Sequence, residues 1–423
     1  DSVYIKALNR RATARENLME YEEAVNDYTA CCIIDEFKNQ NFAIAMERSL
    51  KALTEEKTKE VLKSKDLGFP SGYVIASYLE GFHCCVEAAL SEVPADSTLA
   101  GDAFYRDALA ALLAEKYEEA ERLIVQAIDA TCTRQHHAVA LRAVFMGLRG
   151  NMLEAMRYFA QALELKPNDV ETMVLRGATL LQLGDVPAGM EQFTQALAID
   201  DANADVYYNR GQGYFIQGEL SNAAADYKKA IELDDTRSVA YIQLGMTQYR
   251  LGEKRAAEAT FRRASRTFPS SAHVRIFHSE LLIDQQRFDD AEKLLEEASK
   301  LDPKNALSWV NRALLCMQQK GDPAGAETLL QQAIEGACMN HHWQQVCISL
   351  FIYSCMHVIV DGECEAAMIS LAQLYLQQGK MADALALFER GVALARTEQE
   401  ISTMVGYCEV GQSLLHTHDL LVV

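Results

Sequence analysis

The chain has 423 residues, 49% of them hydrophobic and 24% charged, which is the composition of a globular protein and not of a disordered one. Its 40 basic and 60 acidic residues give a formal net charge of −20, which opposes general nucleic-acid binding and favours positively charged partners such as basic peptides. The apolar stretch at residues 346–360, inside the uncharged run 336–360, is shorter than the ~20 residues that span a bilayer, so we expect a soluble chain.

The eleven cysteines do not form a recognisable metal or redox motif. The adjacent pairs Cys31–Cys32 and Cys84–Cys85 lack the Cys-x-x-Cys spacing of such sites. Cys31 and Cys316 fall on predicted helices, at positions that suit a small apolar side chain. We therefore expect reduced cysteines, as in a protein that faces the cytosol.

Small residues recur at an interval of 34 residues, and large apolar residues recur in step with them. The small series is Ala143, Gly177, Gly211, Gly245, Ser279 and Ala313, and the large series is Phe159, Phe193, Tyr227, Phe261 and Leu295. This is the tetratricopeptide pattern, in which each unit is a helix-turn-helix that cannot bury its apolar face alone. The interval therefore predicts an all-α superhelix of stacked units, an α-solenoid with a peptide-binding concave surface.

In chain order, residues 1–36 match one such unit, with Ala12 and Ala24 at the small positions. This unit opens without a cap, so we expect further repeats upstream of it. Residues 37–101 break the interval and are predicted to be a helical spacer. Helical periodicity continues to Leu62, and Gly68 then begins an interruption that precedes a second apolar stretch, GYVIASYLEGF.

The repeats resume at Asp102 and are expected to run to residue 423 as one superhelix. Their units are expected to begin near His136, Val170, Ala204, Ser238, Ala272 and Ala306. The unit at Ala306 carries one extra residue near Asp322–Pro323. A last unit begins at about Cys364, and the tail after Thr397 should form a closing helix.

Residues 336–363 interrupt the last part of this array. They add roughly 25 residues beyond what the repeat requires and are unusually rich in Cys, Met and apolar residues. Two interpretations are open: a genuine inserted helix that covers the groove, or an artefact of the gene model such as translated intron. Repeat length does not distinguish them.

Three stretches together resemble one family. They are KALNRRATARENLMEYEEAVNDYTA with EFKNQNF, then KALTEEKTKEVL, and then PSGYVIASYLEGF. They are similar to the spacer region of the 70-kDa preprotein receptors of the mitochondrial outer-membrane translocase (TOM), and NADVYYNRGQ and GVALARTEQEIS are similar to later repeats of that family. The resemblance implies a non-enzymatic import receptor on the cytosolic face of the outer membrane, with a membrane anchor upstream of this chain.

The resemblance also implies two binding surfaces and several partners. An N-terminal clamp of the family grips the acidic tails of the 70-kDa and 90-kDa heat-shock chaperones, and its Lys-x-x-x-Arg signature reads here Lys6 and Arg10. Residues four apart lie on one helix face, where two cations suit the carboxylates of an Asp-ended peptide. The family's other clamp residues lie on repeats that this chain lacks, so chaperone binding is expected to be weak or absent. Mitochondrial preproteins and other TOM subunits are the remaining implied partners.

The preprotein surface is predicted from repeat geometry. Positions 2, 5, 9 and 12 of each first helix are expected to face the concave side and to receive a basic amphipathic signal helix. In the central units these are Asp205, Tyr208, Gln212, Phe215, Val239, Ile242, Met246, Tyr249, His273, Ile276, Glu280 and Ile283. The alternative interpretation is that residues such as Ile242 and Ile276 pack only between adjacent helices. Arg176, Arg210 and Arg312 are interpreted as structural partners of acidic groups.

A search for catalytic motifs finds none that its context supports, so neither a cofactor nor a metal is expected. Gly211 and Gly213 follow a helix and not a strand, which excludes a dinucleotide fingerprint. His136–His137 and His341–His342 are adjacent pairs, whose side chains diverge on a helix. Two other hypotheses remain beside the receptor: a soluble adaptor that links chaperones to clients, and the superhelical arm of a larger enzyme.

Overall fold

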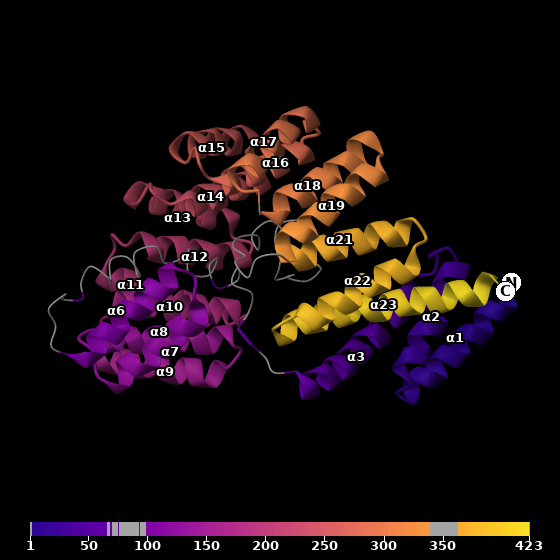
Figure 1. Cartoon of the computed structure of the whole chain (residues 1–423), viewed down its shortest axis with the longest axis horizontal. Coiled ribbons are helices and arrows are strands. Elements are labelled where there is room, and N and C mark those ends of the chain that lie inside the picture. The colour runs from indigo at the N-terminus through magenta and orange to yellow at the C-terminus, as the bar shows by residue number, and fades with distance from the viewer. Residues whose placement is uncertain are drawn as a thin grey trace.

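The structure is a computed structural model that describes residues 2–65, 68–69, 75, 93, 99–303, 305–338 and 363–422. Every regular element in these residues is a helix, as the repeat interval predicts (Figure 1). The first helices in chain order are α1 (Ser2–Asn17), α2 (Tyr21–Ile34) and α3 (Gln40–Ser64). Apart from the buried Ile75, the predicted second apolar stretch of the spacer lies outside the described residues, as do residues 339–362 of the predicted insertion.

Paired helices of similar length make up most of the remainder. The pairs are α6 (Ala100–Leu113) with α7 (Tyr117–Asp129), α8 (Gln135–Leu148) with α9 (Met152–Leu165), α10 (Val170–Gln182) with α11 (Val186–Ile199), α12 (Ala204–Ile216) with α13 (Leu220–Leu233), α14 (Ser238–Arg250) with α15 (Lys254–Thr267), and α16 (Ala272–Asp284) with α17 (Phe288–Leu301). After them come α18 (Ala306–Leu315), η1 (Cys316–Lys320), α19 (Pro323–Cys338), α21 (Glu363–Gln377), α22 (Met381–Leu394) and α23 (Glu398–Val422). The first helices begin within one or two residues of the predicted positions.

The recurring small residue on the first helix of a unit leaves room for the aromatic ring on the second helix of the same unit. A Cβ atom added at Gly177 would lie 2.6 Å from the Phe193 ring, and one added at Gly245 would lie 2.7 Å from the Phe261 ring. Both distances are shorter than real contacts, so the two helices of a unit approach as closely as they do only with glycine there. Phe261 also stacks on His278 of the next unit, with ring centroids 5.3 Å apart.

The extra residue of the Ala306 unit lies within the first helix of that unit, where the backbone widens into a π-helical turn. Residues Cys316–Lys320 form the π-helical turn η1, which directly continues α18. A π-turn takes one more residue than an α-turn, so the following second helix keeps its place in the array. Sequence spacing locates the extra residue near Asp322, and the structure places it in the turn before.

The spacer contacts both ends of the repeat array. The ammonium of Lys65, just after α3, donates hydrogen bonds to the carbonyls of Val392 and Ala393 at 2.7 and 3.0 Å. Four residues later Phe69 is buried against α8, with its ring 5.2 Å from that of Phe145 and the Arg149 guanidinium 4.0 Å above it.

The closing helix α23 returns to the beginning of the chain. It packs on α22 and also on α2 and α3, and the Ser413 hydroxyl donates to the Thr29 hydroxyl at 2.9 Å. In Figure 1 the units follow an arc from α6–α9 to α22, and α23 lies beside α2 and α3 at the far end. The cysteines at 31, 32, 132, 316 and 408 are buried and unpaired, as expected for small core side chains.

Candidate peptide-binding surfaces

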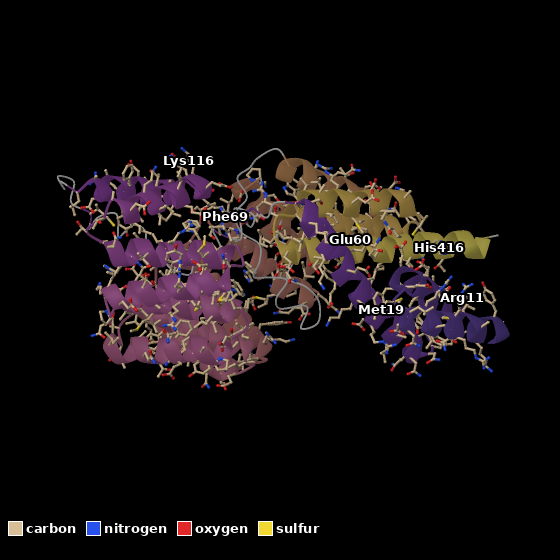
Figure 2. The ribbon with its side chains drawn as sticks, turned by 90° about the horizontal axis from the view of Figure 1, so that it is seen from below. Arg11, Met19, Glu60, Phe69, Lys116 and His416 are labelled. Carbon is tan, nitrogen blue, oxygen red and sulfur yellow. The ribbon has the colours of Figure 1, made fainter. Side chains whose placement is uncertain are left out.

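The basic helix α1 has two kinds of cation. Arg11 forms a bidentate ion pair with Asp27 on α2, at 2.8 and 2.6 Å, and Arg15 reaches the same carboxylate at 2.7 Å. Lys6 and Arg10 are exposed, and neither makes an ion pair or a hydrogen bond within the described residues. Because they lie one helical turn apart, both charges are available on α1 to an external carboxylate. Figure 2 shows α1 with Arg11 at the margin of the molecule.

The residue at position 2 of the first helix in a unit, Asp205 or His273, contacts the residue just before the first helix of the next unit. The buried Asp205 pairs with Arg237, which directly precedes α14, and His273 Nε2 lies 3.2 Å from the amide of Asn305, which precedes α18. Burial raises the pKa of Asp205, and the Arg237 charge opposes that shift. The Arg237 guanidinium also lies 5.0 Å from the centre of the Tyr208 ring. These contacts fix the spacing of neighbouring first helices.

Most apolar members of the predicted strip, Ile283 excepted, belong to the core. Ile242 is 1% exposed in a cluster with residues of α13, α15 and α16, and Ile276 is fully buried among residues of α17 and α18. These two residues pack between adjacent helices, as in the alternative interpretation. The other members with less than 9% exposure are Asp205, Tyr208, Phe215, Val239 and Met246. Their side chains offer a bound peptide little surface.

The accessible part of the strip is mainly polar. Gln212 donates to the Tyr208 hydroxyl at 2.7 Å, the Tyr249 hydroxyl donates to Asp284, and Asn311 donates to Glu280 at 3.0 Å. Burial and the Asp284 carboxylate raise the pKa of Tyr249 to about 12, so this phenol stays protonated as a donor. Gln212, Tyr249, His273, Glu280 and Ile283 are all partly exposed. We call Gln212, Tyr249, Glu280 and Ile283 the polar strip.

Two of the strip's hydrogen-bonding partners, Asp284 and Asn311, are absent from the sequence-based set. Asp284 is the last residue of α16, one beyond the position-12 residue Ile283, and Asn311 lies on α18 three residues before the interval's Leu314. Repeat spacing gives the register of both residues but does not select them, and only the packing of neighbouring first helices shows that they meet Tyr249 and Glu280.

The arginine before the small position has a structural role in the central unit. Arg210 forms a bidentate ion pair with the buried Asp226, at 2.7 and 2.8 Å, which repeats the Arg11–Asp27 geometry of the first unit. Arg312 lies 5.1 Å from the Trp309 ring, and among the described residues it forms no ion pair with a carboxylate. The interpretation of these residues as partners of acidic groups is therefore confirmed at Arg210.

The adjacent histidines of α8 diverge as helix geometry requires. His136 Nε2 lies 3.7 Å from Asp169, whereas the buried His137 contacts the Tyr105 hydroxyl and lies 3.1 Å from Glu171. The two rings meet different carboxylates and so do not converge on one ion. The second predicted pair, His341–His342, lies outside the described residues.

Stacked two-helix units with a small residue under each aromatic ring define a tetratricopeptide-repeat superhelix, a class of binding scaffold. Models of the tetratricopeptide repeat match residues 204–236, 238–270, 278–340 and 367–401, and the chain is a tetratricopeptide-repeat protein.

The curated relatives that it matches are import receptor subunits. The mitochondrial import receptor subunit TOM70 of Homo sapiens is 28% identical over 97% of this chain and 67% of its own length, and that of Rattus norvegicus is 27% identical over the same shares. The crystal structure of the yeast Tom70 matches 97% of this chain and 82% of that one, with 25% identity and a TM-score of 0.63. The chain is thus homologous to TOM70 along nearly its whole length. In the described parts of the chain, no helix combines the length and the apolar character that crossing a membrane requires.

Proposed function

We propose that the chain is a mitochondrial import receptor that binds preproteins on its C-terminal superhelix and chaperone tails at its N-terminal unit. The observation that carries this proposal is the similarity to TOM70 over 97% of the chain, in sequence and in fold. The corresponding division is a last clamp repeat at 1–36, a spacer at 37–101 and a preprotein-binding superhelix at 102–423. The proposed location is the cytosolic face of the mitochondrial outer membrane, in contact with other TOM subunits, and the proposed role is non-catalytic.

Preprotein binding is assigned to the polar strip and not to the buried residues beneath it. Glu280 and the adjacent Asp284 place carboxylates where a basic signal helix would lie, which favours a positively charged peptide. Ile283 supplies partly exposed apolar surface at the same place. The buried residues Tyr208, Ile242 and Met246 hold the first helices at the spacing that positions these groups.

Binding of a carrier-derived internal-signal peptide, measured by fluorescence anisotropy, tests this assignment. We expect Glu280→Gln and Tyr249→Phe each to weaken binding several-fold, because each removes a charge or a hydrogen bond at the strip without creating a cavity. Gln195→Ala, on the exposed side of α11, is the control and should bind as the unmodified chain does. Unchanged affinity in both strip variants would exclude the strip as the peptide surface.

Chaperone docking is assigned to the exposed pair Lys6 and Arg10. An Asp-ended peptide that reproduces a chaperone tail should bind through its carboxylates, and Arg10→Ala should abolish that binding. Lys51→Ala on α3 changes an exposed lysine away from α1 and should have no effect. If the tail peptide binds and the carrier peptide does not, the soluble adaptor becomes the better description of the protein.

A further inference from the structure

One helix of this acidic protein is strongly basic. α15 carries five basic residues against the single acidic Glu258, a local charge of +4 in 14 residues, whereas the whole chain carries −20. Its arginines at 255, 262 and 266 are exposed and follow a spacing of seven and four residues. This spacing places them in one line along the helix, with the small Ala259 between the first two. We call Arg255, Arg262 and Arg266 the basic stripe.

Internal contacts leave most of this charge available. Arg255 and Arg266 make no hydrogen bond, ion pair or ring contact within the described part of the chain. Arg262 forms an ion pair with Glu258 at 2.6 Å, but the Arg262 side chain is 61% exposed. The same Glu258 carboxylate also forms an ion pair with Arg287 at 3.0 Å. One carboxylate shared by two guanidinium groups does not neutralise the stripe.

The stripe is specific to this unit and is not a property of the repeat. One interval later, on α17, the equivalent positions carry Asp289, Glu296 and Lys300. One interval earlier, on α13, they carry Ser221, Lys228 and Glu232. A surface that only needed solvation would show the mixed charges of these neighbours, so the concentration of arginine on α15 requires another explanation.

We propose that the basic stripe of α15 is a docking surface for an acidic segment of a partner polypeptide. The stripe runs from Arg255 to Arg266, 11 steps along the helix or about 16 Å, which about five residues of an extended chain would cover. It is one helix wide, and the exposed carboxylates of Asp289 and Glu296 lie on the next second helix. A flat anionic surface such as a membrane would meet those carboxylates too, whereas a narrow acidic segment can follow α15 alone. In Figure 1, α15 lies at the outer rim of the arc.

This surface is separate from those of the proposed function. It selects the opposite charge to the polar strip, and it lies far along the chain from Lys6 and Arg10. An acidic probe would also find that N-terminal pair, so the test has to separate the two. A peptide of about twelve glutamates, with an amidated C-terminus and a fluorescent label, serves as the probe, because it spans the stripe and lacks the terminal carboxylate suited to Lys6 and Arg10.

The decisive variant is Arg255→Glu with Arg266→Glu, in which both reversed residues lack internal partners and are exposed. We expect it to weaken binding of the probe by about tenfold at low salt, and the affinity of the unmodified chain to fall steeply between about 50 and 200 mM salt. Lys300→Glu reverses the single basic residue at the equivalent positions of α17 and should leave the affinity within about twofold.

Three outcomes would overturn the proposal. The first is equal affinity of the double variant and the unmodified chain, with matching thermal unfolding curves. The second is loss of probe binding in Lys6→Ala with Arg10→Ala but not in the α15 variant, which would locate the acidic ligand at the N-terminal unit. The third is binding to phosphatidylserine vesicles that is lost with the α15 reversals, with no binding of the glutamate peptide.

Discussion

The Lys65 ammonium lies 2.7 Å from the carbonyl oxygen of Val392, so a residue of the spacer caps the last turn of a helix near the other end of the chain. The carbonyls at a helix C-terminus lack partners within the helix, and a cation there also complements the helix dipole. The spacer therefore does more than connect two groups of repeats: it caps the C-terminal end of α22.

Replacing Lys65 with methionine should remove this cap while keeping the length of the side chain. We expect a loss of about 1 kcal/mol, concentrated at the end of α22. Hydrogen exchange of the amides of residues 389–395 would show it as faster exchange. Lys63→Met, at an exposed position near the end of α3, is the control and should leave these amides protected. Equal exchange in both variants would mean that water replaces the lysine without cost.

The ion pair of Arg210 and Asp226 should contribute far more than an exposed pair. Asp226 is 6% exposed, so Arg210→Met would leave a buried carboxylate without its partner. A cost of about 3 kcal/mol is expected for such a broken pair, measured as a lower denaturant midpoint. Adding Asp226→Asn should recover part of the loss. Lys293→Met, which breaks a 3.8 Å pair between exposed residues, should cost less than about 0.5 kcal/mol.

His278 should make the protein sensitive to acid. Its ring stacks on Phe261, neither ring nitrogen has a hydrogen-bond partner in the described residues, and burial lowers its pKa to about 4. In the unfolded chain the imidazole has its ordinary pKa of about 6.5. As the pH falls from about 6.5 to about 4, the unfolded state therefore gains a proton that the folded state does not, and stability falls by up to about 3 kcal/mol.

The check is the unfolding free energy as a function of pH in His278→Leu. Leucine is the residue at the equivalent position of the preceding unit, Leu244, so the substitution suits the fold. Between about pH 6.5 and about pH 4 the unfolding free energy of the unmodified chain should fall because of His278. We expect the variant to lack this part of the fall. His416→Gln, at an exposed site, should keep the full decline, and an identical profile in His278→Leu would refute the assignment.

Met19 occupies a turn that glycine fills in most other units. Its φ is 65°, and the equivalent Gly150 and Gly184 have φ of 78° and 79°. The left-handed conformation costs a non-glycine residue about 1 kcal/mol or more, and Met19 is exposed, so its side chain contributes little packing. Met19→Gly should therefore stabilise the protein by about 0.5–1 kcal/mol, seen as a higher denaturant midpoint. Figure 2 shows Met19 at this turn.

The neighbouring residue provides the control for that substitution. Leu18 is 69% exposed and has no positive φ, so Leu18→Gly gains nothing in the folded state and loses backbone entropy. It should destabilise the protein slightly. If both glycine variants destabilise it, the turn does not strain Met19.

The repeat interval predicts the helices well because it records a local requirement. Gly177 and Gly245 have to be small for the ring of the same unit, and that contact depends on residues only 16 positions apart. The candidate peptide surface was less accessible to sequence reasoning. Whether Ile242 or Tyr249 faces solvent depends on how far each unit rotates against the next, and side-chain volumes in several units set that rotation together.

Contacts between distant segments have no periodic signal at all. Nothing in the pattern around Lys65 indicates that it meets Val392, because the residue type and spacing are those of an ordinary exposed lysine. The π-turn at Cys316 is an intermediate case. The interval shows that a residue has been added to the unit, but only the backbone shows that a helix, and not the loop after it, contains it.

The hydrogen bond between Thr29 and Ser413 joins segments 384 residues apart. In an open array each unit touches only its neighbours, so the outermost units fray first and the chain folds largely through local contacts. Here the first described unit and the closing helix hold each other. Fraying at either end therefore breaks contacts at both, so the contacts of α23 with α2 and α3 raise the contact order above that of an open array and couple the melting of the two ends.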